Sequence, residues 1–165
     1  MIKLSVEEII DKINRHELFK AIADDGSFAI KIDDYAPHIC AAIHDGHHFR
    51  DELEQKTLLA ENERWYEEDP HTADFVSSFP ILIKGRDSRF EYDLNRGPED
   101  CVYEEAWGKA VWKTPLSDVE KEESVAKHTK FYKVVKALVH KIEEIYGSAI
   151  VYDMHSYNYK RREKG

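Results

Sequence analysis

The chain has 165 residues, which is enough for one domain with a core of its own. Apolar residues make up 42% and charged residues 35%, the balance of an ordinary soluble globular protein without low-complexity tracts. The formal net charge of −9 argues against a nucleic-acid partner, because binding to phosphates needs a basic face.

The cysteines and the apolar runs bear on the cellular compartment. Cys40 and Cys101 lie far apart in the sequence and do not make a disulfide framework, so we expect a reducing environment. The N-terminus has no signal-peptide core, and no apolar run approaches membrane-spanning length. These features predict a cytoplasmic protein without a membrane partner.

The first elements alternate between helical and extended patterns. Ser5 and Glu8 form the pattern of a capping box, and apolar residues at helical intervals predict an amphipathic helix over residues 6–23. Residues 28–32 alternate loosely and predict a strand. Residues 39–43 are continuously apolar, which is typical of a strand buried on both faces.

The middle of the chain is less regular. We interpret residues 49–60 and 72–78 as short helices or turns, and residues 97–116 as irregular. Residues 80–83 and 89–93 predict a pair of strands joined by a short turn. These strands would lie next to each other in the sheet.

The last third of the chain predicts one long helix and a final strand. Ser117 begins a second capping box, apolar positions up to Tyr146 trace one helical face, and Gly147 ends the helix. Residues 149–152 predict a last buried strand.

The order of these elements predicts a single α/β domain over residues 1–165. We expect three layers, with a mostly parallel or mixed sheet and helices on both faces. The chain stops about ten residues past the last predicted strand, where a parallel sheet normally has a covering helix. We therefore expect the domain to be incomplete at its C-terminus.

Three polar blocks, His44–His47, Asp93–Arg96 and Asp153–Ser156, follow the predicted strands. Loops after strands are where α/β folds gather their active sites. Histidines in the first and third blocks can bind a metal ion, and an Asn–Arg pair can hold a carboxylate. The combination predicts a zinc hydrolase that acts on a substrate with a free carboxylate.

The histidines have a functional and a plain interpretation. His44 and His47 could bind one zinc ion if the chain turns at Gly46, or they could be ordinary polar loop residues. His155 follows a predicted strand, and Asp153 lies on the same face of that strand, where its carboxylate can orient the histidine. We therefore expect His155 to bind the metal.

The middle block also has two interpretations. Asp93 can hold a ligand histidine in one tautomer, while Asn95 and Arg96 can bind a carboxylate. The plain alternative is a surface Asp–Arg pair, which adds little stability. Earlier in the chain, Glu68 and Asp69 could supply a metal ligand or a general base, or could simply complement the start of a helix.

Together these blocks resemble the N-formylglutamate amidohydrolase family, which is itself similar to the zinc carboxypeptidases. The resemblance runs through Ala42–Gly46, Glu68–Thr72, Arg89–Arg96 and Tyr152–Ser156, in the family's order. It covers the chain from about residue 38 to the C-terminus. It implies a phosphorylase/hydrolase-like α/β fold and one catalytic zinc ion per chain.

The resemblance also implies a set of zinc ligands. His44 matches the first ligand and His155 the last. The middle ligand is open between His47 and Asp69, with Glu68 behind them, because the carboxypeptidases have a glutamate where this chain has His47.

The resemblance further implies how the substrate is held. Asn95 and Arg96 match the pair that binds the substrate's carboxylate, and Asp93 matches the hydrogen-bond partner of a zinc histidine. The carboxypeptidase-like general base is a glutamate well after the last zinc histidine, and this chain has only ten residues there. Glu68 is therefore our candidate for the catalytic carboxylate, and Arg89 for the group that stabilises the oxyanion.

The predicted function is a zinc-dependent amidohydrolase that removes the acyl or formyl group of an N-acyl amino acid such as N-formylglutamate. The alternative is a catalytically silent zinc- or carboxylate-binding remnant of that family, which the missing glutamate favours. A third possibility is a non-enzymatic remnant whose histidines are structural. The sequence leaves the oligomeric state open.

Overall fold

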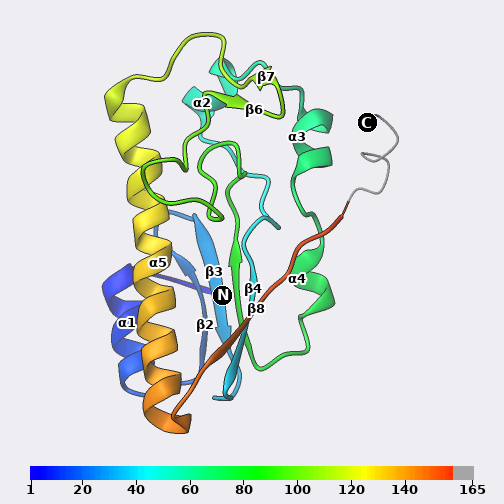
Figure 1. Ribbon diagram of the computed structural model, residues 1–165. Coiled ribbons are helices and arrows are strands. Elements are labelled where there is room, and N and C mark those ends of the chain that lie inside the picture. The colour runs from blue at the N-terminus through cyan, green and yellow to red at the C-terminus, as the bar shows by residue number, and fades with distance from the viewer. Residues whose placement is uncertain (158–165) are drawn as a thin grey trace.

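A computed structural model describes residues 1–157 of the chain (Figure 1). Six of its strands form one mixed sheet in the order β1-β2-β3-β5-β4-β8. β1 is parallel to β2, and β4 is parallel to both β5 and β8, whereas β3 is antiparallel to both of its neighbours. The strands of the sheet are β1 (Ile2–Leu4), β2 (Phe19–Ala23), β3 (Phe28–Ile32), β4 (His38–Ala42), β5 (Ile81–Gly85) and β8 (Ile150–Asp153).

Helices cover both faces of this sheet, as Figure 1 shows. α1 (Val6–Asn14) and α5 (Asp118–Tyr146) pack together on one face, and α4 (Thr72–Phe75) contacts β4 from the other. α2 (Asp51–Lys56) and α3 (Glu61–Glu67) lie beyond the sheet, near the hairpin of β6 (Glu105–Ala106) and β7 (Lys109–Ala110). The predicted three-layer α/β arrangement with a mixed sheet is confirmed.

The apolar core lies on both sides of the sheet, because β4 is buried on both faces. Ile39 and Ala41 of β4 belong to the main cluster, which joins the sheet to α1 and α5. Cys40 and Ala42 point to the opposite face and pack with residues of α4. This two-sided burial explains the continuous apolar run at residues 39–43 and fixes the position of His44, which follows it.

The first predicted helix is too long. The capping box of Ser5 and Glu8 is present, but α1 ends at Asn14, and His16 follows with a left-handed φ of 60°. Residues 19–23 form β2 instead, in which Phe19 and the two alanines are buried alternately. Alanine carries a weak apolar signal, so the period of two was hidden behind the helical spacing of larger residues.

The predicted strand at residues 89–93 is also wrong. The chain turns there, and β5 pairs with β3 and β4 rather than with a hairpin partner. Phe90 and Tyr92 are buried, as the alternation suggests, but Glu91 and Asp93 are buried as well. The polar positions are therefore paired inside the protein and do not form the solvent face of a strand.

The last helix is confirmed, and the last strand is confirmed only in part. Ser117 caps α5, and Gly147 ends it with a left-handed φ of 80°. β8 follows, but it is the edge strand of the sheet and its side chains are exposed, so the prediction that it is buried is wrong. No helix within residues 1–157 is both long and apolar enough to cross a membrane.

Candidate metal centre

Two neighbouring parallel strands bring two histidines to the same edge of the sheet. β4 ends just before His44, and β8 ends at Asp153, two residues before His155. The two imidazole centroids are 5.1 Å apart. The side chain of His44 is 1% exposed and that of His155 is 36% exposed, so the pair joins the interior to the surface.

Asp69 lies between the two histidines. Its Oδ2 is 3.3 Å from His44 Nδ1 and 2.9 Å from His155 Nδ1. Its Oδ1 accepts hydrogen bonds from the backbone N–H of Ser156 at 3.0 Å and from the Ser156 hydroxyl at 2.7 Å. Ligand atoms of His44, Asp69 and His155 all lie within 4.8 Å of one another, and we call these three residues the candidate metal centre.

The second nitrogen of each imidazole also faces a carboxylate. His44 Nε2 lies 2.7 Å from Asp93 Oδ1, and His155 Nε2 lies 3.0 Å from Asp153 Oδ2. A neutral imidazole has a single N–H and cannot donate to carboxylates on both sides. A divalent cation on the Nδ1 side would leave each Nε2–H to donate to its outer carboxylate, as in known histidine–metal sites. The donor set therefore fits a divalent metal ion.

The centre carries negative charge, which suits a cation. Burial raises the pKa of Asp69, but hydrogen bonds from His44, Ser156 and His155 outweigh burial and hold that pKa well below its ordinary value. Burial also raises the pKa of Asp93, but its contacts with His44 and Arg89 outweigh burial, so the pKa lies below its ordinary value. Both carboxylates are therefore ionised at neutral pH.

Asp93 is held in place by a dense set of donors. It is fully buried and accepts hydrogen bonds from Arg89 Nη2 at 2.7 Å, from the backbone N–H of Asn95 at 2.8 Å, and from the hydroxyl of Tyr103. These contacts fix the carboxylate that faces His44. Burial lowers the pKa of His44, and Asp69 and Asp93 together raise it above its ordinary value.

The structure separates the two candidates for the middle ligand. Asp69 lies between the histidines, whereas His47 Nδ1 pairs with a carboxylate oxygen of Glu68. The other oxygen of Glu68 accepts from the hydroxyl of Ser88. The geometry thus favours Asp69 as the ligand and places His47 behind Glu68.

Gly46 is required for a reason other than a turn between two ligands. A Cβ at this position would lie 2.2 Å from the backbone carbonyl carbon of Arg86, far inside van der Waals contact. The backbone N–H of His48 donates to the Arg86 carbonyl oxygen at 3.0 Å. Glycine therefore lets the loop after β4 lie directly against the chain after β5.

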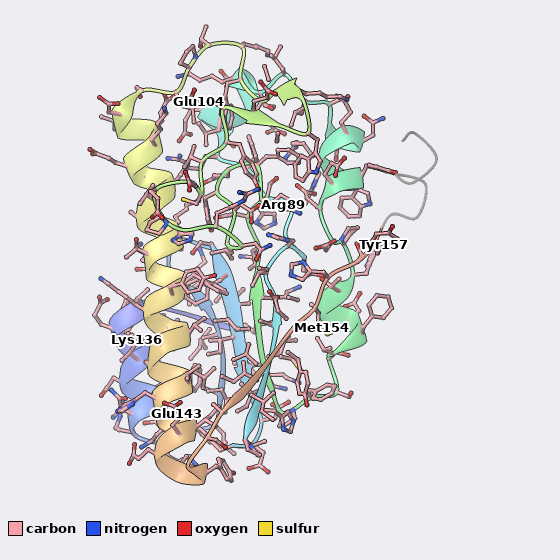
Figure 2. The ribbon with its side chains drawn as sticks, viewed as in Figure 1. Arg89, Glu104, Lys136, Glu143, Met154 and Tyr157 are labelled. Carbon is pink, nitrogen blue, oxygen red and sulfur yellow. The ribbon has the colours of Figure 1, made fainter. Side chains whose placement is uncertain are left out.

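A small hollow of about 130 Å³ opens beside the centre. Figure 2 shows Arg89 in the interior beyond the end of the sheet, and Met154 and Tyr157 on the chain that follows β8. The hollow is lined by Glu67, Glu68, Asp69, Arg89, His155, Ser156 and Tyr157. It therefore brings the candidate catalytic residues Glu68 and Arg89 next to two of the three candidate ligands.

The predicted carboxylate-binding pair lies outside this lining. Asn95 and Arg96 are both exposed, and the Arg96 guanidinium carbon lies 5.8 Å from the centre of the Tyr103 ring. Because the Tyr103 hydroxyl donates to Asp93, Arg96 is connected to His44 through two intervening residues. The assignment of this pair to the substrate stays a prediction.

Sequence reasoning missed three residues that support the centre. Ser156 holds Asp69 and could have been suspected, since it directly follows His155 in a block already singled out. Tyr103 holds Asp93 from a segment without a regular sequence pattern, and Ser88 holds Glu68. No local sequence pattern marks Tyr103 or Ser88, because neither belongs to one of the polar motifs and each contacts a residue at least ten positions away in the chain.

The sequence model of the N-formylglutamate amidohydrolase family matches residues 36–165. No curated protein matches the chain. The crystal structure of gene product Atu2144 from Agrobacterium tumefaciens is similar, with a TM-score of 0.67 and 17% identity over 79% of this chain. At this level of identity, the similarity shows only that the two proteins share a fold. The match spans 56% of the Agrobacterium chain.

Proposed function

Because the chain belongs to the N-formylglutamate amidohydrolase family, we propose that it is a zinc-dependent hydrolase of N-acyl amino acids such as N-formylglutamate. The convergence of His44, Asp69 and His155, with a carboxylate behind each histidine, supports this proposal most strongly. In the reaction, the oxygen of water bonds to the acyl carbon and the C–N bond breaks. The leaving nitrogen takes a proton from that water, which gives a free acid and an amine.

His44, Asp69 and His155 are the residues that would hold the ion. Two imidazole nitrogens and one carboxylate are a donor set that suits zinc. When bound, zinc supplies a Lewis acid that polarises the scissile carbonyl and makes water acidic enough to attack it. Asp93 and Asp153 keep the two histidines in the tautomer that leaves Nδ1 open.

Glu68 is the proposed general base. It is buried, it adjoins Asp69 in the chain, and it lines the hollow beside His155. His47 and Ser88 hold its two oxygens in a fixed position. From there the carboxylate accepts the proton of the attacking water and delivers it to the leaving nitrogen.

The substrate is held by arginines in this proposal. Arg89 lines the hollow and pairs with Asp93 at 2.7 Å, so its guanidinium is positioned to stabilise the negative oxygen that develops on the acyl group. Arg96 and Asn95 bind the free carboxylate of the amino acid from the exposed rim. This division would hold the scissile bond beside the residues that bind the ion.

The two cysteines support a proposal for the cellular compartment. Cys40 and Cys101 are both buried and unbonded. Burial raises the pKa of both thiols, that of Cys101 to about 11, so neither is reactive at neutral pH. Free thiols are typical of reducing compartments, and we therefore propose the cytoplasm.

A second candidate function is binding without turnover. It is favoured by one observation, namely that both oxygens of Glu68 already accept hydrogen bonds from His47 and Ser88. In that case the chain would hold zinc and an acyl amino acid but would release neither formate nor amine.

Hydrolysis of N-formylglutamate by zinc-loaded protein tests the proposal. We expect turnover by the wild type, loss of both turnover and zinc in Asp69→Asn, and loss of turnover with retained zinc in Glu68→Gln. Asp74→Asn is the matched control, since Asp74 is exposed and lies outside the centre. If the wild type bound zinc but did not hydrolyse the substrate, the second candidate function, binding without turnover, would be supported instead. Full activity in Glu68→Gln would refute the assignment of Glu68 as the general base.

A further inference from the structure

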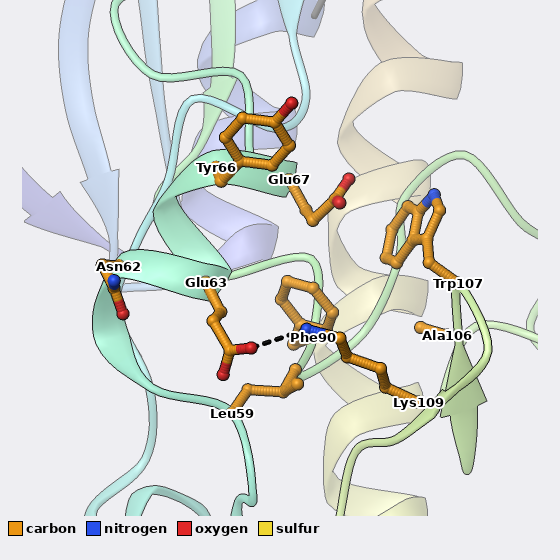
Figure 3. A pocket seen from close by; sticks show the side chains of 9 residues that line it. All are labelled: Leu59, Asn62, Glu63, Tyr66, Glu67, Phe90, Ala106, Trp107 and Lys109. Atoms are coloured by element: carbon orange, nitrogen blue, oxygen red, sulfur yellow. Dashed lines mark hydrogen bonds and ion pairs between the residues drawn. The ribbon is translucent and has the colours of Figure 1, made fainter. Parts of the chain in front are cut away.

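A second and larger hollow, of about 370 Å³, lies between α3 and the β6–β7 hairpin (Figure 3). Its volume falls in the range of about 300–1,000 Å³ that is typical of small-molecule sites. Apolar and aromatic side chains form most of its wall, namely Leu59, Tyr66, Phe90, Ala106 and Trp107. None of the residues assigned so far to catalysis or metal binding is among its lining residues.

This hollow adjoins the smaller hollow that opens beside the candidate metal centre. Glu67 lines both hollows, and Arg89, which lines the smaller one, is followed in the chain by Phe90, which lines the larger one. The Arg89 guanidinium carbon also lies 5.0 Å from the centre of the Trp107 ring. A substrate with its amide in the smaller hollow can therefore extend a substituent into the larger one.

Trp107 has an unusual backbone conformation for its size. It is the first residue of the two-residue turn between β6 and β7, with a φ of 51°, and Gly108 follows with a φ of 74°. Asn-Gly is the favoured pair in such turns, and a bulky residue with this φ is an outlier. The turn itself therefore gives no reason for tryptophan at this position. Strained residues of this kind cluster at ligand sites, which is a reason to look for a ligand beside Trp107.

Trp107 is also only partly used in packing. Its ring contacts Phe90 and Tyr103, with centroids 5.5 and 5.9 Å apart, yet 45% of the residue is exposed. Figure 3 shows the indole and Phe90 beside the same open space, with Tyr66 on its other side. The hairpin thus presents an aromatic ring to the hollow.

The charges around the hollow disfavour an acidic occupant. Glu63 and Glu67 line it, and the ammonium of Lys109 is already engaged by Glu63 at 2.6 Å. Among the described residues that line the hollow, Lys109 is the one cation, so a carboxylate placed here would compete with Glu63 for it. A neutral aromatic group would instead pack against aromatic rings at favourable angles.

We propose that the larger hollow, lined by Phe90 and Trp107, is a substrate subsite for a neutral apolar group of about phenyl size attached near the scissile amide. This inference rests on the proposed hydrolase function and narrows its substrate class. It predicts a preference for aromatic N-acyl amino acids over N-formylglutamate. The group belongs either to the amino acid or to the acyl part, and the two cases are separated by the choice of substrates.

Two matched substrate pairs test the subsite in the zinc-loaded full chain. N-formylphenylalanine against N-formylalanine places the ring on the amino acid, and N-phenylacetylglycine against N-acetylglycine places it on the acyl group. We expect kcat/KM to be at least about tenfold higher for the aromatic member of one pair. Equal values within both pairs would overturn the subsite and would leave the hydrolase function standing.

Variants locate the preference in the structure. Trp107→Asn removes the ring and suits the left-handed backbone, so the turn should be kept. Ala106→Leu fills part of the hollow. Both should reduce the aromatic-to-aliphatic ratio of kcat/KM about tenfold, whereas Phe75→Asn, an exposed aromatic position outside both hollows, should keep the wild-type ratio. A ratio unchanged in Trp107→Asn and Ala106→Leu would place the preference elsewhere.

A binding measurement separates failure of the subsite from failure of the enzymatic function. Calorimetric titration of the chelator-treated full chain with the same four compounds requires neither zinc nor turnover. Tighter binding of an aromatic compound, lost in Trp107→Asn, would support the subsite even if no amide were hydrolysed. Equal binding of aromatic and aliphatic compounds would refute it whatever the activity.

Discussion

Replacing Asp93 by asparagine keeps the size of the side chain and removes the charge on which several groups depend. Asp93 is fully buried and lies 2.7 Å from both His44 Nε2 and Arg89 Nη2, and it also accepts from the hydroxyl of Tyr103. An amide has one oxygen that accepts and a nitrogen that only donates. At least one of these three donors would therefore face another donor.

The size of the effect follows from the burial of the pair. The side chain of Arg89 is 14% exposed and that of Asp93 is fully buried, and removal of one partner from a buried pair costs about 3–5 kcal/mol. The exposed pair of Asp74 and His71 is worth about 0–1 kcal/mol. We expect Asp93→Asn to lower the free energy of unfolding of the metal-free protein by about 3 kcal/mol more than Asp74→Asn does. Its zinc affinity should fall by about 10–100-fold, because Asp93 orients His44.

Urea unfolding of both variants in the presence of a chelator measures the first effect, with tryptophan fluorescence as the signal. Competition against a chromophoric chelator measures the second. If Asp93→Asn and Asp74→Asn unfolded at the same urea concentration, the account of the buried pair would be refuted. Zinc affinity equal to that of the wild type would show that Asp93 does not support His44.

Three further predictions test separate parts of the structure. Hydrogen bonds from the Lys56 ammonium and the Ser117 backbone hold the pKa of Glu120 at about 2, below its ordinary value of 4.5. Its contribution to stability is therefore present above the ordinary value and lost as the pH falls toward 2, and Glu120→Gln should show less acid destabilisation in urea titrations over that window. Gly46→Ala should lower the unfolding free energy by about 1–3 kcal/mol, seen as a lower Tm, since its Cβ would meet backbone at 2.2 Å; an unchanged Tm would contradict this. Arg96→Ala should raise KM for N-formylglutamate about tenfold with kcat and zinc content retained, and an unchanged KM would remove this residue from the substrate site.

Much of the fold can be predicted from local patterns in the sequence. The capping boxes at Ser5 and Ser117 mark the starts of α1 and α5, and the apolar run at 39–43 marks β4. These signals are strong because each depends on residues next to one another in the chain. Together with Gly147, which ends α5, they place the long helix and the strand that leads to His44.

The wrong predictions have a common cause, namely contacts between residues that are distant along the chain. Residues 89–93 alternate like a strand, yet Glu91 and Asp93 are buried because they pair with groups from other segments, Arg50 for Glu91 and His44 for Asp93. β8 carries an apolar sequence but lies at the edge of the sheet, since sheet order is set by tertiary packing. Neither fact can be read from local composition.

In the candidate site, too, some residues can be predicted from local motifs and others depend on tertiary packing. Local motifs were sufficient to select His44 and His155, because both follow strands. They could not decide between His47 and Asp69, since that choice depends on how the segment before α4 folds against β4. The large hollow beside Trp107 was not anticipated, because its walls come from three segments that lie far apart in the sequence.

The most direct test of the account is the zinc content of the purified chain by elemental analysis, measured for the wild type, His155→Ala and His140→Ala. His140 is exposed on α5 and serves as the matched control. The account predicts one zinc ion per chain in the wild type and in His140→Ala, and none in His155→Ala. Full zinc occupancy in His155→Ala, or no zinc in the wild type after zinc is supplied, would contradict the metal centre from which the proposed function is built.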